Sequence, residues 1–291
     1  MRRCRLLVSG LFVLLLLGSA AAAAAPALWR IEENGARVYL FGTIHLLKAD
    51  TPWRDAAIEE AFREAGTLVV EAAVDTVDPA TLQATIRRIG YYPEGDSLAA
   101  HVAPPLFDRI MAESQKAGLP TEVVVRMRPW LVGLTLTSAI ATAKGFLPQF
   151  GAEAELLEEA RKRKMAILPL ETVEEQFAVF AGLSDAAQTA LITRGLDEID
   201  NIEALFEEMK SAWLAGDLAA LDRLLKDGLE DNPELAEAML HARNRRWIPK
   251  IEALLETPGT YFVAVGTAHL VGEGSVIDLL GGAGHAVARQ Q

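Results

Sequence analysis

Cysteine is almost absent from this chain of 291 residues, which contains only Cys4. Cys4 lies in an N-terminal segment that has the layout of a secretory leader: three arginines in the first five residues, an apolar core over 11–17, and an alanine run that ends at Ala25. Cleavage of residues 1–25 would leave no cysteine. The mature chain is therefore expected to have no disulfide, no thiolate nucleophile and no cysteine ligand for a metal.

Positive charge is scarce as well. The chain has 28 Lys and Arg against 40 Asp and Glu, a formal charge of −12, and loss of the three leader arginines gives −12 − 3 = −15. So acidic a protein is a poor candidate for binding nucleic acid or an anionic membrane surface. The apolar core of the leader is short for a membrane span. We therefore expect a periplasmic or secreted protein without stable membrane insertion.

Pro/Ser-rich linkers, low-complexity tracts and short repeats are also lacking, so residues 26–291 are expected to form one domain with its own core. Continuous apolar runs predict buried strands, and helical patterns separate them, which is typical of an α/β protein. We expect a central mixed or mostly parallel sheet with flanking helices. The predicted strands are 37–41, 67–74, 165–170, 260–265 and, less clearly, 285–289.

A helical layer over about 172–256 is predicted between the third and fourth of these strands. One helix is expected from a cap at Ser184 to about residue 215, and another from Asn232-Pro233 towards Leu255. The apolar stripe of the first could pack in the core or against a second copy of the chain. A homo-oligomer is thus left open.

The most informative pattern is a phrase written twice. An apolar run leads into Gly42-Thr-Ile-His45 near the start and into Gly266-Thr-Ala-His269 near the end, with 224 positions (269 − 45) between the histidines. Glu71 follows a third apolar run. Side chains at the carboxyl ends of parallel strands gather at one edge of the sheet. If these strands are parallel neighbours, both imidazoles and the carboxylate converge.

Such a set suits a divalent ion that keeps open positions for water and substrate. Each element also has a plain structural interpretation: Gly-x-x-His can be a turn followed by an incidental histidine, and a nearby arginine can neutralise a buried glutamate. The repetition of the phrase favours a shared site. Arg128 fits two roles equally well, pairing with a buried carboxylate or binding substrate.

Over nearly all of 27–291 the sequence resembles the TraB/GumN family, whose animal relatives are the TIKI metalloproteases. The resemblance is carried by "YLFGTIHLL", "TLVVEAAV", "RMRPWLVGLTL", "PLETVEEQF", "RNRRW" and "YFVAVGTAHLVG". It matches His45 and His269 to the family's paired Gly-x-x-His motifs and Glu71 to the acid after the first. It also matches Arg243 and Asn244 to an Arg-Asn pair and Glu171 to a "LET" element.

The resemblance implies further expectations. The animal relatives are described as proteases that depend on divalent cations such as cobalt or manganese. The fold looks related to that of erythromycin esterases, which use His and Glu for hydrolysis without a metal. One departure is visible: where the family often has Gly-x-Asp, this chain has Glu153, whose extra methylene moves the carboxylate and leaves its role in doubt.

The first hypothesis is a divalent-metal-dependent hydrolase acting on peptides. His45, Glu71 and His269 would hold Mn, Co or Zn, and the bound water would attack a carbonyl. Arg243 or Asn244 would stabilise the oxyanion, Arg128 and Glu171 would contact substrate, and Glu171 or Glu153 would be the base.

Two alternatives remain open at this stage. A metal-independent hydrolase would use His45 or His269 as base, oriented by Glu71. A non-catalytic protein would bind a peptide signal or an envelope glycan at the same residues.

Overall fold

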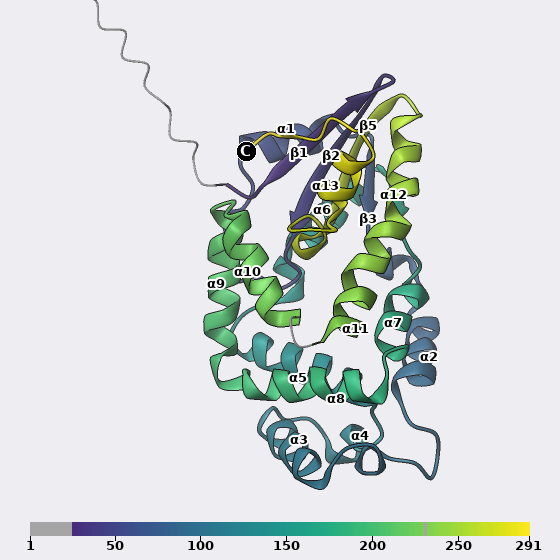
Figure 1. Cartoon of the computed structure of the whole chain (residues 1–291), viewed down its shortest axis with the longest axis vertical. Helices are drawn as coiled ribbons and strands as arrows, with labels where there is room; N and C mark the ends of the chain where they lie inside the picture. Colours follow the sequence, from purple (N-terminus) through teal and green to yellow (C-terminus); the bar gives the residue numbers. More distant parts are fainter. Residues whose placement is uncertain (1–24, 230–231) are drawn as a thin grey trace, which may run out of the picture.

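The computed structural model describes residues 25–229 and 232–291. Its centre is a six-stranded sheet with the order β4-β3-β5-β2-β1-β6. The strands are β1 Leu28–Glu33, β2 Ala36–Thr43, β3 Thr67–Val70, β4 Ala166–Pro169, β5 Gly259–Gly266 and β6 Ala288–Arg289. In Figure 1 the sheet occupies the upper part of the molecule, above a layer of helices. The predicted leader lies outside the described residues, except for its last residue, Ala25.

The sheet is mixed and mostly parallel, as predicted. β2 pairs in parallel with β5, β5 with β3, and β3 with β4, whereas β1 runs antiparallel between β2 and β6. Sequence analysis missed β1. The turn after it carries Asn34 and Gly35 with φ of 49° and 79°, and an Asn-Gly pair in this conformation is the preferred two-residue hairpin connection.

Helices cover both faces of the sheet, which explains the continuous apolar strands. On one face Phe41 and Phe262 pack against α1 (Ala56–Glu64) and α6 (Ala152–Lys162). On the other face Val38 and Val263 pack against α12 (Ala242–Leu255) and α13 (Val276–Gly282). Because neighbouring residues of a strand point to opposite faces, β1, β2, β3 and β5 each contribute to both clusters.

The predicted helical layer over 172–256 is confirmed, and more helices lie between β3 and β4. The helices of the layer over 172–256 are α7 Val173–Ala181, α8 Asp185–Asp197, α9 Ile202–Leu214, α10 Leu218–Leu229, α11 Pro233–Ala236, the π-helical turn η5 Glu237–His241, and α12. The helices between β3 and β4 are α2 Pro79–Gly90, α3 Pro104–Lys116, α4 Thr121–Val124, α5 Pro129–Ala143 and α6.

The prediction of one helix from Ser184 to residue 215 is wrong. Ser184 does cap α8, but a 3-10 turn at Ile199–Asn201 breaks the helix before α9 begins. The two helices pack in different hydrophobic clusters: Ile192 of α8 packs in the cluster around α5, whereas Trp213 of α9 packs against the sheet. In Figure 1, α8 crosses the bottom of the main body and α9 rises along its side.

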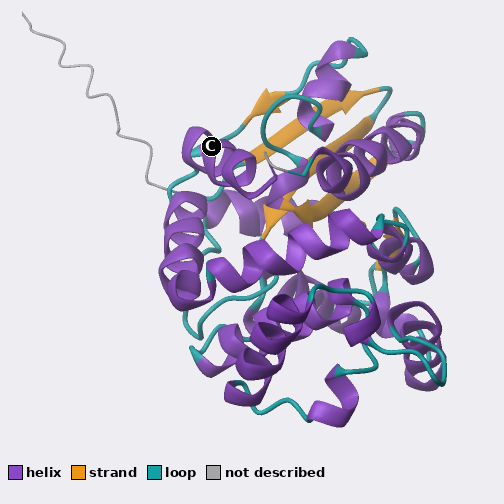
Figure 2. Ribbon diagram, turned by 60° about the horizontal axis from the view of Figure 1, so that its bottom comes forward, coloured by secondary structure: helices purple, strands orange, loops and turns teal. Residues whose placement is uncertain are grey.

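The second predicted helix begins where expected, because the Asn232 side chain accepts a hydrogen bond from Leu235 N. Its course is not uniform, since η5 joins α11 to α12. Figure 2 shows the helices gathered around the sheet. Among residues 25–229 and 232–291, no helix has both the length and the apolarity that crossing a bilayer requires.

Candidate functional site

The sheet order brings the two Gly-Thr-x-His phrases side by side. β5 lies between β2 and β3, all three are parallel, and Thr43 is the register partner of Gly266. The carboxyl ends of three strands from distant parts of the chain therefore lie at one edge, as the sequence predicted.

Both glycines of the phrase are needed for this close approach. A Cβ on Gly42 would lie 2.9 Å from Thr267 Oγ1 and 3.1 Å from Thr267 Cα, a separation that real Cβ atoms hardly tolerate. With that space left open, Thr267 Oγ1 donates a hydrogen bond of 3.0 Å to the Thr43 carbonyl oxygen. Trp213 Nε1 donates to the Gly42 carbonyl oxygen at 2.8 Å. The two Gly-Thr-x-His phrases are thus in direct contact and joined by a hydrogen bond.

Three predicted side chains meet around Gly266. A Cβ placed there would lie 3.0 Å from Glu71 Oε1, 3.7 Å from His269 Cδ2 and 3.7 Å from His45 Nε2. His269 and Glu71 are each 3% exposed, whereas 59% of the His45 side chain is exposed. The site therefore has a buried floor and one histidine at its mouth.

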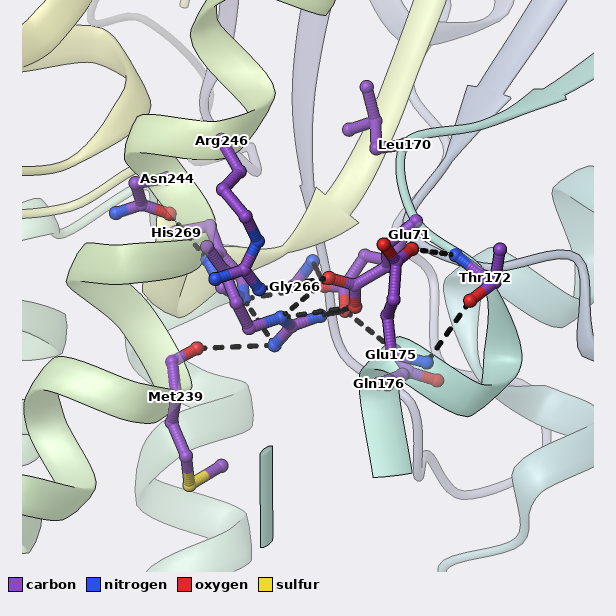
Figure 3. Close-up of polar contacts among 12 residues, drawn as sticks. Glu71, Leu170, Thr172, Glu175, Gln176, Met239, Asn244, Arg246, Gly266 and His269 are labelled. Atoms are coloured by element: carbon purple, nitrogen blue, oxygen red, sulfur yellow. Dashed lines mark hydrogen bonds and ion pairs between the residues drawn. The ribbon is translucent and has the colours of Figure 1, made fainter. Parts of the chain in front are cut away.

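Arg243 is the centre of the buried floor. Its Nη2 donates to Glu71 Oε2 and to Glu171 Oε1, both at 2.5 Å, and its Nε donates to Glu171 Oε1 at 3.1 Å. Its Nη1 donates to His269 Nε2 at 3.0 Å and to the Met239 carbonyl oxygen at 3.2 Å. Figure 3 labels three of the residues that contact Arg243, namely Glu71, His269 and Met239. One guanidinium thus satisfies two buried carboxylates and one imidazole.

The position of Arg243 follows from a local irregularity of the helix. It lies in the first turn of α12, directly after η5, which contains Met239. Single π-helical turns are rare and frequently accompany functional sites. The Met239 carbonyl oxygen that accepts from the guanidinium belongs to this turn.

His269 is a neutral imidazole of defined tautomer. Asn244 Nδ2 donates to the Gly274 carbonyl oxygen, so Asn244 Oδ1 faces the ring and accepts from His269 Nδ1–H at 2.6 Å. His269 Nε2 then holds the lone pair that accepts from Arg243. Burial lowers the pKa of His269 to about 3, with the Arg243 charge acting in the same direction. Trp247 packs against the ring with centroids 4.3 Å apart.

Glu71 is ionised and fully partnered. Oε1 accepts from Gly266 N at 2.6 Å, and Oε2 accepts from Gln176 Nε2 at 3.1 Å and from Arg243. Burial by itself would raise the pKa of Glu71. The His269 ring and the Arg243 guanidinium outweigh burial and hold that pKa at about 2.

His45 has a different environment because it lies next to a second carboxyl group. Its Nδ1 is 3.9 Å from Glu153 Oε2, in the first turn of α6. Glu153 Oε2 is buried without a hydrogen-bond partner. Burial, reinforced by the negative charge of Glu71, raises the pKa of Glu153 to about 8, so this carboxyl group is protonated at neutral pH.

The predicted metal ligands do not fit a single ion in this arrangement. Both ring nitrogens of His269 already have hydrogen-bond partners. Arg243 contacts His269 Nε2 and Glu71 Oε2, and an ion held by His269 and Glu71 would need the lone pairs of these same two atoms. Within residues 25–229 and 232–291, no three His, Asp or Glu side chains form a ligand group. A metal bound by all three residues would have to displace the guanidinium.

A pocket of about 370 Å³ opens onto these groups. His45, Glu71, Arg243 and His269 are among its lining residues. The part of the lining that comes from α9, α10 and η5 forms an apolar wall: Phe206, Met209, Leu221, Leu224, Leu225, Met239 and Leu240. This is a common layout for small-molecule sites, with a few polar groups set in an apolar cavity.

Not every predicted site residue lies here. Glu171 and Asn244 do belong to the network, but as partners of Arg243 and His269. Arg128 caps α5, and its guanidinium lies 5.0 Å from the centroid of the Tyr92 ring in the lower helical layer. A substrate contact of Arg128 stays a prediction.

Sequence analysis missed Gln176, which follows the "LET" element in "PLETVEEQF", and Trp247, which follows the Arg-Asn pair. It named Glu153 only as a candidate base. Gln176 and Trp247 lie in motifs that carried the resemblance, and this position in the sequence was the signal that could have indicated them.

Comparison with known proteins agrees with that resemblance. A sequence model described as the TraB/PrgY/gumN family matches residues 27–289. The chain is 26% identical over 242 residues to "Uncharacterized protein YbaP" of Escherichia coli (strain K12), covering 83% of this chain and 87% of that protein. The YbaP protein of Shigella flexneri matches to the same extent. No solved structure shows a significant match.

Proposed function

The chain belongs to the TraB/PrgY/GumN family, and from this premise and the geometry of the site we propose that it is an exported hydrolase. His45 acts as its general base without a metal. The observation that carries the proposal is the placement of the His45 ring, exposed at the mouth of the pocket between Glu71 and Glu153. Of the two histidines, only His45 is accessible to water and substrate.

The chemistry follows from the exposed ring and from the ionised Glu71, which lies near it around Gly266. His45 takes a proton from a water molecule, and the water oxygen attacks a carbonyl carbon of an ester or peptide. The ionised Glu71, fixed by three donors, stabilises the imidazolium that forms. When the tetrahedral intermediate collapses, the imidazolium returns the proton to the leaving group.

The buried network supplies the rigid base for this step. Arg243, Glu171, His269 and Asn244 hold Glu71 in one position through the contacts described above. A base and its orienting carboxylate must keep their geometry to be effective. We therefore assign Arg243 and Asn244 to positioning, in place of the oxyanion role expected from the sequence.

The location of the activity forms part of the proposal. We propose that the mature chain acts in the periplasm or outside the cell, on a peptide or an envelope-derived substrate. The support is the sequence of residues 1–25 and the acidic charge of the remainder.

The test is hydrolysis of esters and peptides by purified mature protein after exhaustive chelation. We expect activity to survive chelation and His45→Ala to lower kcat/KM at least a hundredfold, the usual contribution of a general base. His285→Gln is the matched control, because His285 pairs with Glu33, away from the pocket. Activity that vanishes on chelation and returns with Mn, Co or Zn would favour the metal hypothesis. Equal activity of His45→Ala and the parent would overturn the role of His45.

A further inference from the structure

The apolar wall of the pocket beside His45 and Glu71 has no role in the chemistry proposed so far. It is formed by three separate elements, α9, α10 and η5, which all present apolar side chains to the pocket. In Figure 1, α9 and α10 lie side by side below the sheet. Charged residues of α10 such as Lys226 and Asp227 do not line this pocket. The side chains with which α9, α10 and η5 line the pocket are therefore all apolar.

The polar side of the pocket offers no free cation to an anionic group. Arg243 is shared by the carboxylates of Glu71 and Glu171, and His269 is neutral. An anionic substrate group would have to be desolvated here without an unpaired partner of opposite sign, which is costly. An uncharged, apolar group instead gains free energy from leaving water.

The size and side chains of the wall suit a flexible chain. About 370 Å³ is at the small end of ligand pockets. Met209 and Met239, both in the wall, have flexible side chains that adapt to irregular shapes. A second hollow of about 560 Å³ shares six lining residues with the first, among them Met209, Leu224 and Leu240, and its lining also includes the charged residues Arg194, Glu198, Glu208 and Asp227.

From these observations we propose that the pocket holds an uncharged, apolar acyl or side chain attached to the carbonyl that His45 hydrolyses. This inference rests on the proposed function and narrows its substrate class. Leu224 is one of the six residues that line both hollows, so a change of its size should change the accepted length.

The first arm of the test uses p-nitrophenyl esters from acetate to decanoate. We expect kcat/KM to rise about fourfold for each methylene that enters the pocket and then level off. Leu224→Trp, which fills the pocket, should move the plateau to shorter chains, and Leu224→Ala should move it to longer ones. Opposite shifts are not produced by general destabilisation. Leu134→Trp, at an exposed position of α5, is the matched control and should leave the profile unchanged.

The second arm measures binding without turnover, by calorimetry of octanamide and acetamide with His45→Ala protein. We expect octanamide to bind at least tenfold more tightly than acetamide, and Leu224→Trp to abolish the difference. Octanamide binding of this kind without any ester hydrolysis would reject the proposed function and keep the pocket. Hydrolysis that depends on His45 but not on acyl length, together with equal binding of both amides, would overturn the pocket assignment.

Discussion

Arg243 is the residue on which the other buried polar groups of the site depend. It contacts Glu71, Glu171 and His269 at once, and all three are buried. Arg243→Gln would leave two buried carboxylates without their cation. Because uncompensated buried charge is strongly destabilising, we expect the free energy of unfolding to fall by about 3–5 kcal/mol.

Urea denaturation of the mature protein measures this loss. Arg245→Gln is the control on the same helix, because Arg245 forms an exposed pair with Glu237 and should contribute at most about 1 kcal/mol. Equal losses in the two variants would show that the Arg243 network is not built as described.

Glu153 gives a prediction about pH. Its pKa in the folded protein is about 8, against an ordinary value of 4.5. A group whose folded pKa is raised stabilises the protein fully below the unfolded pKa, and this contribution is lost as pH rises through the folded pKa. Glu153→Gln removes the titration, so the parent should lose stability relative to this variant between about pH 4.5 and 8.

Each pKa unit corresponds to about 1.4 kcal/mol, so the relative loss should be easily measured by unfolding at pH 5 and pH 8. Glu158→Gln, at an exposed position of the same helix, serves as the control, because the hydrogen bond with Lys162 lowers the pKa of Glu158 and keeps its titration below this pH range. A parent and a Glu153→Gln variant with parallel pH profiles would contradict a protonated Glu153.

At the scale of elements, β2 and β5 approach each other so closely because their phrases contain glycine. Gly42→Ala would place a Cβ 3.1 Å from the Thr267 Cα atom and disturb the hydrogen bond between Thr267 and Thr43. Overpacking of this kind costs about 1–3 kcal/mol. Gly66→Ala is the control, since nothing lies within 4 Å of a Cβ there. If thermal unfolding shows the same shift for both variants, close packing does not explain the repeated glycine.

Sequence reasoning succeeded where one element determines its own pattern. The β2 and β5 apolar runs, the Ser184 and Asn232 caps and the Gly-x-x-His turns are local signals, and all lie where predicted. It failed where tertiary packing decides. The break between α8 and α9 lets the two helices pack in different hydrophobic clusters, and the apolar stripe in the sequence does not indicate this break.

The site shows the same division. That His45, Glu71 and His269 meet followed from strand ends and a guess at strand order. The position of Arg243 among them did not follow, because an arginine on a distant helix gives no sign of which carboxylates it will pair with. That contact places a buried charge network around Glu71 that the sequence did not predict.

For the whole molecule, the central claim is that the first and last thirds of the chain build one site, since β2 and β5 are adjacent in the sheet. Residues 26–291 contain no cysteine, so pairs introduced into this part of the chain report strand neighbours without interference. Arg37 and Thr260 are register partners, and neighbouring strands lie about 5 Å apart, within disulfide reach.

The decisive measurement is therefore the rate of disulfide formation in mature Arg37→Cys/Thr260→Cys under mild oxidation, compared with Arg37→Cys/Ala166→Cys. Ala166 lies in β4, which β5 and β3 separate from β2. We expect rapid, intramolecular cross-linking of the first pair and little of the second. A folded protein in which the first pair stays reduced, or in which both pairs cross-link equally, would contradict the shared site.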